Sequence, residues 1–357
     1  MMPLNNKIVV AAAGAGKTTE IVRSALAHPK ERILITTYTN NNEKEIRKKF
    51  TEEIGYIPEN VVIQTWFTFL LRDLVRPYQN AVFGTQRIDG LAFVEGQSKL
   101  KVPEKNTAAY YFSSKKDIYS DKISKFAYRC NAETDGAVID RLSSIYKQIY
   151  IDEVQDLAGW DIEILELLLE SRISTVLVGD YRQATFQTNQ SRKNKQFVGA
   201  NIIKKFDAWE KAKLCEKVEM NHSHRCNQLV CDFSDRFFPT AAKTTSKNLH
   251  DTGHDGVFVI RKAALADYIK KYSPQVLRYN RKETCGGLQA LNYGESKGLS
   301  FDRTVIFPHG PLRTVIETGD FSKLKEPSNL YVAVTRARYS ITIVYDGVIG
   351  VGGVIPL

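Results

Sequence analysis

Short apolar runs rich in Val, Ile and Thr alternate with longer segments of helical periodicity along most of this 357-residue chain. Repeated strand–helix alternation is best satisfied by a parallel sheet with helices packed on its faces. The pattern therefore predicts an α/β fold. The expected strands are KIVVAAA, RILITT, NVVIQT, KQIYIDE and STVLVGD in the first 180 residues, and GVFVIRK, PQVLRYN, RTVIFP and SITIVYD after about residue 216.

The length exceeds the roughly 100–200 residues of one domain, so we expect two tandem α/β units, residues 1–215 and 216–357. Residues 79–145 lack long apolar strands and mix aromatic with basic side chains, which predicts a small helical insertion in the first unit. The hydrophobic share of 43% and the charged share of 25% are typical of globular proteins and argue against extensive disorder.

The charge balance favours a polyanionic partner. Fifty Lys and Arg against forty Asp and Glu leave a net charge of +10, which suits nucleic acid. No run approaches the ~18 apolar residues of a membrane span, and the first residues lack the pattern of a secretory signal. The five cysteines form no CxxC pair, so we expect free thiols, no zinc site and a cytoplasmic protein.

Residues 11–18, AAAGAGKT, lie between an apolar run and a helical pattern. Gly14 and Gly16 let successive backbone N–H groups turn toward one anion, while Lys17 can reach the β- and γ-phosphates. A chance Gly-rich turn is the alternative, but the flanking strand and helix favour a phosphate loop. The residues expected to hold ATP here are Ala13, Gly14, Ala15, Gly16, Lys17, Thr18 and Thr19.

A second signature is IYIDEVQD, residues 149–156, an apolar strand that ends in two carboxylates. Asp152 can bind Mg²⁺ together with the Thr18 hydroxyl, and Glu153 can polarise the attacking water. An acidic helix N-terminus is the alternative explanation. With a phosphate loop upstream, the catalytic explanation is favoured, with ATP and Mg²⁺ as cofactors.

The motif DEVQD resembles motif II of the UvrD/Rep-type superfamily 1 helicases. Other segments resemble motifs Ia, Ib, III, IV, V and VI in the family's order: TTYTNNNEKEI (36–46), IQTWFTFLL (63–71), VGDYRQATF (178–186), NHSHRCNQLV (221–230), ESKGLSFDRTVIF (295–307) and YVAVTRAR (331–338). The resemblance implies two RecA-like lobes with ATP between them. DEVQD with GDxxQ is similar to UvrD and Rep rather than to the Pif/RecD branch, which implies 3′ to 5′ movement on single-stranded DNA.

The resemblance also implies roles for residues around the phosphates. Arg225 and Arg336 match the positions that reach the γ-phosphate from the second lobe, and Gln183 matches the sensor in the first lobe. His224 stands where the family often stacks an aromatic side chain on adenine; an ordinary surface histidine is the alternative.

The residues expected to contact single-stranded DNA by motif position are Tyr38, Thr39, Asn40, Thr65, Trp66 and Lys297. Tyr38 and the neighbouring Phe67 could instead be core aromatics. Because backbone contacts and stacking discriminate weakly between strands, RNA remains an alternative to DNA.

The chain departs from the family pattern in several places. Thr188 and Asn189 replace the Trp and Arg of motif III, which removes one stacking platform, and Ser300 replaces a ribose-binding Glu in motif V. The adenine-binding Gln motif is missing upstream of the phosphate loop. Only about 50 residues separate motif IV from motif V, too few for the family's large accessory domain.

An intact hydrolytic set with a reduced strand-separating apparatus predicts a compact DNA-dependent ATPase that translocates on single-stranded DNA. The alternative is an ATP-gated switch subunit that controls a partner nuclease or another effector, with little unwinding of its own.

Overall fold

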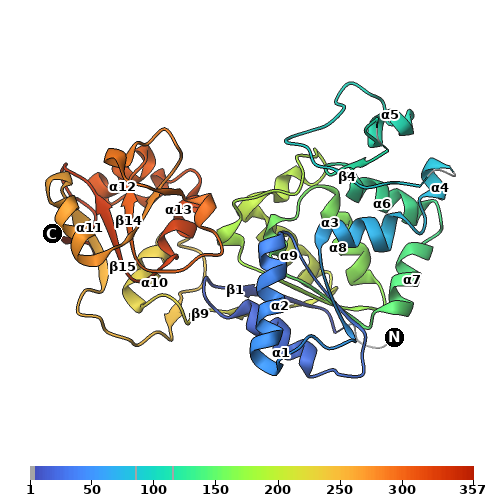
Figure 1. The fold of residues 1–357 in the computed structure, drawn as a ribbon, viewed down its shortest axis with the longest axis horizontal. Coiled ribbons are helices and arrows are strands. Elements are labelled where there is room, and N and C mark those ends of the chain that lie inside the picture. The colour runs from blue at the N-terminus through green and yellow to red at the C-terminus, as the bar shows by residue number, and fades with distance from the viewer. Residues whose placement is uncertain (1–4, 85–86, 115) are drawn as a thin grey trace. The chain divides into compact units, whose positions relative to one another are not determined.

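The computed structural model describes residues 5–84, 87–114 and 116–357. The chain divides into two compact units (Figure 1). The first comprises residues 1–10, 17–181 and 186–219, and the second comprises residues 11–16, 182–185 and 220–357. Two short segments, 11–16 and 182–185, therefore pack with the second unit although the chain on either side of each belongs to the first.

The first unit is built on a six-stranded sheet. Its strands, in spatial order, are β3 (Val61–Thr65), β2 (Ile33–Thr37), β6 (Gln148–Ile151), β7 (Ser174–Gly179), β1 (Lys7–Ala11) and β8 (Glu216–Met220). The pairs β3–β2, β2–β6, β6–β7 and β7–β1 are parallel. Five of these strands match the predicted apolar runs. Strand β8 was not predicted because its sequence, EKVEM, has charged residues at three of five positions.

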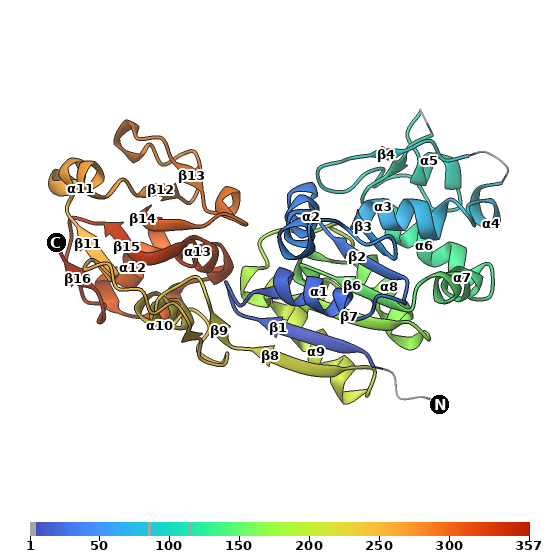
Figure 2. The same ribbon diagram turned by 60° about the horizontal axis from the view of Figure 1, so that its bottom comes forward.

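Helices cover both faces of this sheet (Figure 2). Ile33 and Ile35 of β2 point to the face covered by helices α1 (Lys17–Leu26) and α2 (Asn40–Ile54). Leu34 points to the opposite face, as the two-residue period of a strand requires. That face is covered by α3 (Trp66–Phe69), its π-helical continuation η1 (Leu70–Val75), α8 (Trp160–Glu170) and α9 (Ile202–Lys211).

The segment 79–145 carries four helices in its described part. It contains α4 (Asn80–Phe83), α5 (Thr107–Tyr111), α6 (Ile123–Ala132) and α7 (Ala137–Ile145). It also contains a two-stranded parallel sheet of β4 (Leu91–Ala92) and β5 (Ile118–Tyr119), which the sequence did not predict because each strand is two residues long. Residues 85, 86 and 115 of this segment lie outside the described residues.

The second unit has its own six-stranded sheet, whose observed pairs are parallel. Its order is β13 (Leu291–Asn292), β12 (Gln275–Arg278), β14 (Phe301–Phe307), β15 (Ala337–Val344), β11 (Gly256–Ile260) and β16 (Ile355–Pro356). Helices α10 (Gln228–Asp235), α12 (Gly310–Thr318) and α13 (Pro327–Val334) cover one face, and α11 (Leu265–Tyr272) covers the other. Strands β9 (His222–Ser223) and β10 (Thr245–Ser246) form a separate pair.

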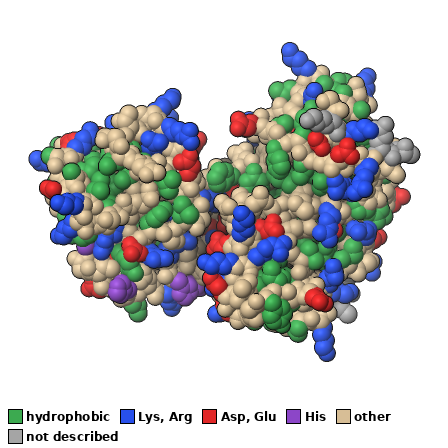
Figure 3. Space-filling view, viewed as in Figure 1, with side chains coloured by type: hydrophobic (Ala, Val, Ile, Leu, Met, Phe, Trp, Pro, Cys, Tyr) green, Lys and Arg blue, Asp and Glu red, His purple; other side chains and the backbone are tan. Residues whose placement is uncertain are grey.

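Two six-stranded parallel sheets covered by helices confirm the predicted α/β fold with tandem lobes. The five cysteines are buried and form no disulfide. In the described part of the chain, no helix combines the length and the apolar character that a membrane crossing needs. On the face seen in Figure 3, Lys and Arg side chains are spread over both units rather than gathered in one patch.

Candidate functional site

The predicted phosphate loop has the backbone that such a loop requires. Strand β1 ends at Ala11, and Gly14 and Gly16 have φ angles of +76° and +89°, in the left-handed region that other residues rarely adopt. The turn closes where the Ala15 N–H donates to the Ala12 carbonyl at 3.1 Å. Helix α1 begins at Lys17, and its first turn carries the half-buried Lys17, Thr18 and Thr19.

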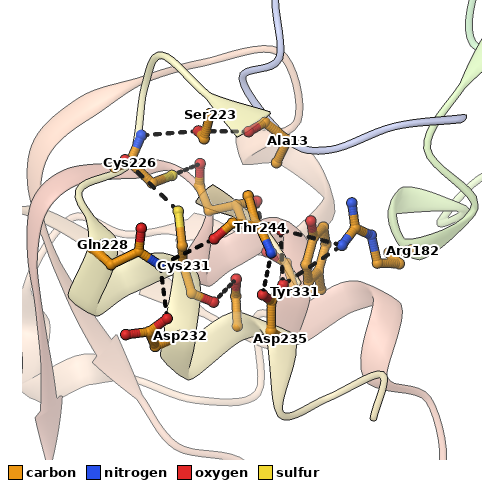
Figure 4. Close-up of polar contacts among 12 residues, drawn as sticks. Ala13, Arg182, Ser223, Cys226, Gln228, Cys231, Asp232, Asp235, Thr244 and Tyr331 are labelled. Carbon is orange, nitrogen blue, oxygen red and sulfur yellow. Dashed lines mark hydrogen bonds and ion pairs between the residues drawn. The ribbon is translucent and has the colours of Figure 1, made fainter. Parts of the chain in front are cut away.

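The loop segment 11–16 is hydrogen-bonded to the last residue of β8 and to residues just after it. The Ala12 N–H donates to the Met220 carbonyl at 2.9 Å, and the Ser223 hydroxyl donates to the Ala13 carbonyl at 2.8 Å (Figure 4). The His224 N–H donates to the Gly14 carbonyl at 2.9 Å. Ser223 was not predicted, because nothing in the sequence marks a serine 210 positions away as the loop's support.

These contacts leave no room for a side chain at Gly14, where a Cβ atom would lie 2.6 Å from the Cβ of Arg225. The His224 ring is exposed and lies against the same loop, since its Cδ2 is 3.9 Å from the position of a Cβ atom on Gly16. His224 therefore lies beside the phosphate loop within the second unit.

The acidic pair lies at the end of β6. Asp152 is 4% exposed, and its N–H donates to the Thr36 carbonyl at 2.8 Å. Burial raises the pKa of Asp152, the neighbouring Glu153 raises it further, and the positive charge of Lys17 opposes the rise. A buried carboxylate beside a second carboxylate favours a nearby cation. A carboxylate and a hydroxyl are oxygen donors of the kind that Mg²⁺ prefers, so the chemistry of Asp152 and Thr18 fits that ion.

Glu153 is held in an unusual backbone conformation, with φ at +56°. A non-glycine residue in this region is strained, and such strain is common at functional sites. The Gln155 side chain donates its amide N–H to the Glu153 carboxylate, while its Oε1 accepts the Asp180 N–H at 3.0 Å. Gln155 thus ties Glu153 to the end of β7. It is a positioning residue that sequence reasoning missed, although the Gln of DEVQD was the available signal.

Three predicted phosphate-binding residues lie together in the second unit, among them Gln183, which was expected in the first lobe. Arg336 is 2% exposed and donates from Nη2 to the Gln183 Oε1 at 2.8 Å. Arg225 donates from Nη1 to the carbonyl of Thr335 at 3.2 Å. Arg225 and Arg336 therefore flank the same residue, and Gln183 contacts one of them directly. Two permanently charged guanidinium groups and one amide can all bind phosphate oxygens.

Arg182, which precedes Gln183, is also buried and was not predicted. Its Nη1 lies 3.6 Å from Asp235 Oδ1 and 3.5 Å from Thr244 Oγ1, and its guanidinium lies 5.0 Å from the Tyr331 ring centroid (Figure 4). Asp235 in turn accepts the Thr244 N–H at 2.6 Å. This network fixes the segment 182–185 to helices α10 and α13.

Lys297 lies half-buried after β13 and donates from Nζ to the backbone carbonyl of Gln183 at 3.1 Å. It was predicted to contact DNA from the second lobe. The observed hydrogen bond joins Lys297 to the segment that carries Gln183, one of the residues expected to sense ATP.

The predicted nucleic-acid residues of the first unit follow two adjacent strands, β2 and β3, which end side by side at the pair Thr37 and Thr65. Thr39 caps helix α2 by accepting the Asn42 N–H at 3.2 Å, and Asn40 is exposed. Thr65 caps α3.

The ring centroid of Tyr38 lies 5.9 Å from that of Phe67. Phe67 is buried and is a core aromatic, whereas Tyr38 is half-buried and keeps part of its side chain exposed.

Trp66 corrects one expectation. Its side chain is fully buried, and its Nε1 donates to Asp161 Oδ1 at 2.8 Å. Asp161 also accepts hydrogen bonds from Ser124, Thr188 and Asn189. Trp66 is therefore a core residue, because stacking on a base would require it to leave this buried network. The same network explains Thr188 and Asn189, which here bind a carboxylate instead of presenting a stacking platform.

Residues 105–345 match the model of the viral superfamily 1 RNA helicase core domain, and residues 2–189 match the AAA_19 model, described as an AAA domain. Over 191 residues the chain is 27% identical to Gabija protein GajB of Bacillus cereus (strain VD045). That match covers 51% of this chain and 38% of the relative, so the chain matches well under half of the relative's length.

Three similar solved structures are viral helicases. The PRRSV helicase is 16% identical with a TM-score of 0.46, over 96% of this chain and 52% of its own. The arterivirus nonstructural protein 10 helicase is 14% identical with a TM-score of 0.49, over 95% and 59%. Its complex with DNA is 14% identical with a TM-score of 0.47, over 95% and 61%.

Proposed function

We propose that this chain, which belongs to the superfamily 1 helicase core family, is an ATP-driven motor that moves on single-stranded nucleic acid. Membership of this family implies that the chain is a P-loop ATPase. DNA as the strand, 3′ to 5′ movement and closeness to UvrD and Rep are the finer parts of the proposal, supported by DEVQD and GDxxQ.

The observation that carries the proposal is the carboxylate pair at the end of β6. In the parallel sheet order β6–β7–β1, this pair shares an edge with the phosphate loop at the end of β1. Asp152 and Thr18 would hold Mg²⁺, which when bound would neutralise phosphate charge. Glu153, fixed by Gln155, would orient and polarise the water that attacks the γ-phosphate.

Arg225, Arg336 and Gln183 are the proposed contacts of the γ-phosphate. The two guanidinium groups donate to the Thr335 carbonyl and to the Gln183 amide oxygen, and phosphate oxygens can replace these acceptors without leaving the guanidinium donors unpaired. Loss of the phosphate after hydrolysis would restore the bond between Arg336 and Gln183. The nucleotide state would thereby change the contacts of the segment 182–185.

Movement without extensive unwinding is the favoured form of the activity. Residues 236–300, all described, build β10, β11, α11, β12 and β13, and all but β10 belong to the second unit's main sheet or cover it. They include no separate domain of the kind that helps open duplexes. The net charge of +10 supports a salt-sensitive contribution to nucleic-acid affinity.

Steady-state ATPase assays with single-stranded DNA, duplex DNA and RNA, run beside a strand-displacement assay, test the proposal. Single-stranded DNA is expected to stimulate hydrolysis most strongly. Lys17→Ala and Glu153→Gln should abolish hydrolysis, whereas Lys30→Ala, an exposed lysine beyond α1, should leave it unchanged. Absence of stimulation by any nucleic acid would contradict the proposal.

The ATP-gated switch subunit is the second candidate. It is favoured by an intact hydrolytic set in a chain that lacks an accessory domain over residues 236–300. It predicts co-purification with a nuclease or other effector whose activity follows the ATP state. Unaided movement along DNA by the isolated protein would favour the motor instead.

A further inference from the structure

We propose that Phe93 stacks on a base of single-stranded nucleic acid and so supplies a binding platform from the insertion in the first unit. This inference rests on the proposed function. Phe93 is 73% exposed, the largest exposed fraction of any aromatic side chain among the described residues. Neither the helicase motifs nor the predicted nucleic-acid residues include it.

Phe93 is the outer member of a row of three aromatic rings. Its ring centroid lies 5.6 Å from that of Phe67 at an interplanar angle of 82°, and Phe67 lies 5.9 Å from Tyr38 at 62°. Tyr38 follows β2 and Phe67 follows β3. The row therefore starts at the sheet edge that carries Thr39 and Asn40, and ends at an exposed ring.

The backbone on both sides of Phe93 is fixed. Ala92 pairs with Tyr119 in the short β4–β5 sheet, and its carbonyl accepts the Ser120 N–H at 3.0 Å. The Val94 N–H donates to the Ser120 hydroxyl at 3.2 Å. Since both neighbours are anchored to one residue, the exposed ring is presented in a defined position, which lowers the entropic cost of binding.

The chemistry around this ring fits a nucleobase. Lys99 Nζ lies 5.9 Å from the ring centroid of Tyr119, which is Ala92's strand partner, so a cation able to reach a phosphate lies one strand away. The expected platforms at Trp66 and in motif III are missing, because Trp66, Thr188 and Asn189 are bound to Asp161. An exposed aromatic beside the same edge can take over that role.

The test compares Phe93→Ala and Phe93→Trp with wild type in binding to a fluorescein-labelled oligo(dT). Leu100→Ala is the matched control, because Leu100 is also 73% exposed and belongs to the same insertion. Phe93→Ala should weaken binding about tenfold, within the roughly five- to hundredfold effect of losing one stacked base. Phe93→Trp should bind as wild type does, and its added fluorescence should fall on binding. Leu100→Ala should change nothing.

A strand of abasic sugar-phosphate units separates stacking from backbone contact. Wild type and Phe93→Ala should bind it equally, since it offers no base. Equal binding of oligo(dT) by wild type and Phe93→Ala would overturn the inference and would suit a protein partner for this ring. An equal loss of affinity for oligo(dT) and for the abasic strand in Phe93→Ala would also overturn it. Either result would leave the proposed function standing. Failure of wild type to bind any single strand, DNA or RNA, would overturn both.

Discussion

Arg336 donates a hydrogen bond of 2.8 Å to Gln183, which lies 153 positions earlier in the chain. The arginine is 2% exposed, and its Nε and Nη1 donate to the carbonyls of Val332 and Leu299. Two residues expected to act on one phosphate are thus bonded to each other.

Substitutions at this pair should therefore behave as one unit. Arg336→Lys keeps the charge but loses the planar fork, and we expect kcat for ATP hydrolysis to fall by about a hundredfold or more. Gln183→Ala should also lower kcat, and the double variant should be little worse than Arg336→Lys alone. Arg338→Lys, an exposed arginine two positions away, is the control. Fully additive losses would show that the two residues act separately.

The buried pair of Arg182 and Asp235 should be important for stability. Asp235→Leu leaves the Arg182 guanidinium buried without its carboxylate, and we expect the free energy of unfolding to fall by about 3–5 kcal/mol. Arg182→Met combined with Asp235→Leu should cost less than the sum of the single changes. A double-mutant cycle from urea unfolding measures the difference. The exposed pair Arg338 and Asp302 gives the comparison, with an expected coupling of about 0–1 kcal/mol; equal couplings would refute the prediction.

Gln155→Leu should affect the chemical step more than ATP binding. The substitution removes the bond that holds the Glu153 carboxylate, so kcat should fall about tenfold while KM for ATP stays nearly constant. Gln148→Leu is the control, because Gln148 is a buried glutamine in β6, the strand that leads to Glu153, at the end away from that residue. A rise in KM with unchanged kcat would mean that Gln155 does not position the catalytic carboxylate.

Asp152→Asn should stabilise the protein in a pH-dependent way when nucleotide and metal are absent. Burial and Glu153 raise the pKa of Asp152 to about 7, above its value in the unfolded chain of about 4. The folded state therefore binds the proton more tightly, and wild type loses stability as pH rises through this interval.

The gain in melting temperature for Asp152→Asn should consequently be small near pH 4 and larger near pH 8. With Mg²⁺ and a non-hydrolysable ATP analogue at pH 8, wild type should have the higher melting temperature of the two proteins, because only the carboxylate can hold the ion. A gain that does not change with pH would contradict the raised pKa.

The fold could be predicted where local patterns determine it. Strands such as Ile33–Thr37 and Gly256–Ile260 are buried on both faces and are therefore apolar runs that the sequence displays. Strand β8 and the two-residue strands could not be found in this way, because pairing with neighbours defines them rather than their own side chains.

The site was predictable to the extent that motifs carry it. The loop containing Gly14 and the pair Asp152 and Glu153 have local signatures. Trp66 occupies a motif position, but its burial depends on Asp161, 95 positions away. Ser223 and Arg182 are likewise defined by distant partners, which no local pattern encodes.

The division of the chain has a practical consequence for anyone who wishes to dissect it. A fragment ending at residue 219 would contain the whole phosphate loop in its sequence, yet it would lack Met220, Ser223 and His224, which fasten that loop. A complementary fragment would contain these supports without the loop. We therefore expect nucleotide binding to require the intact chain, and neither fragment alone is suitable for measuring it.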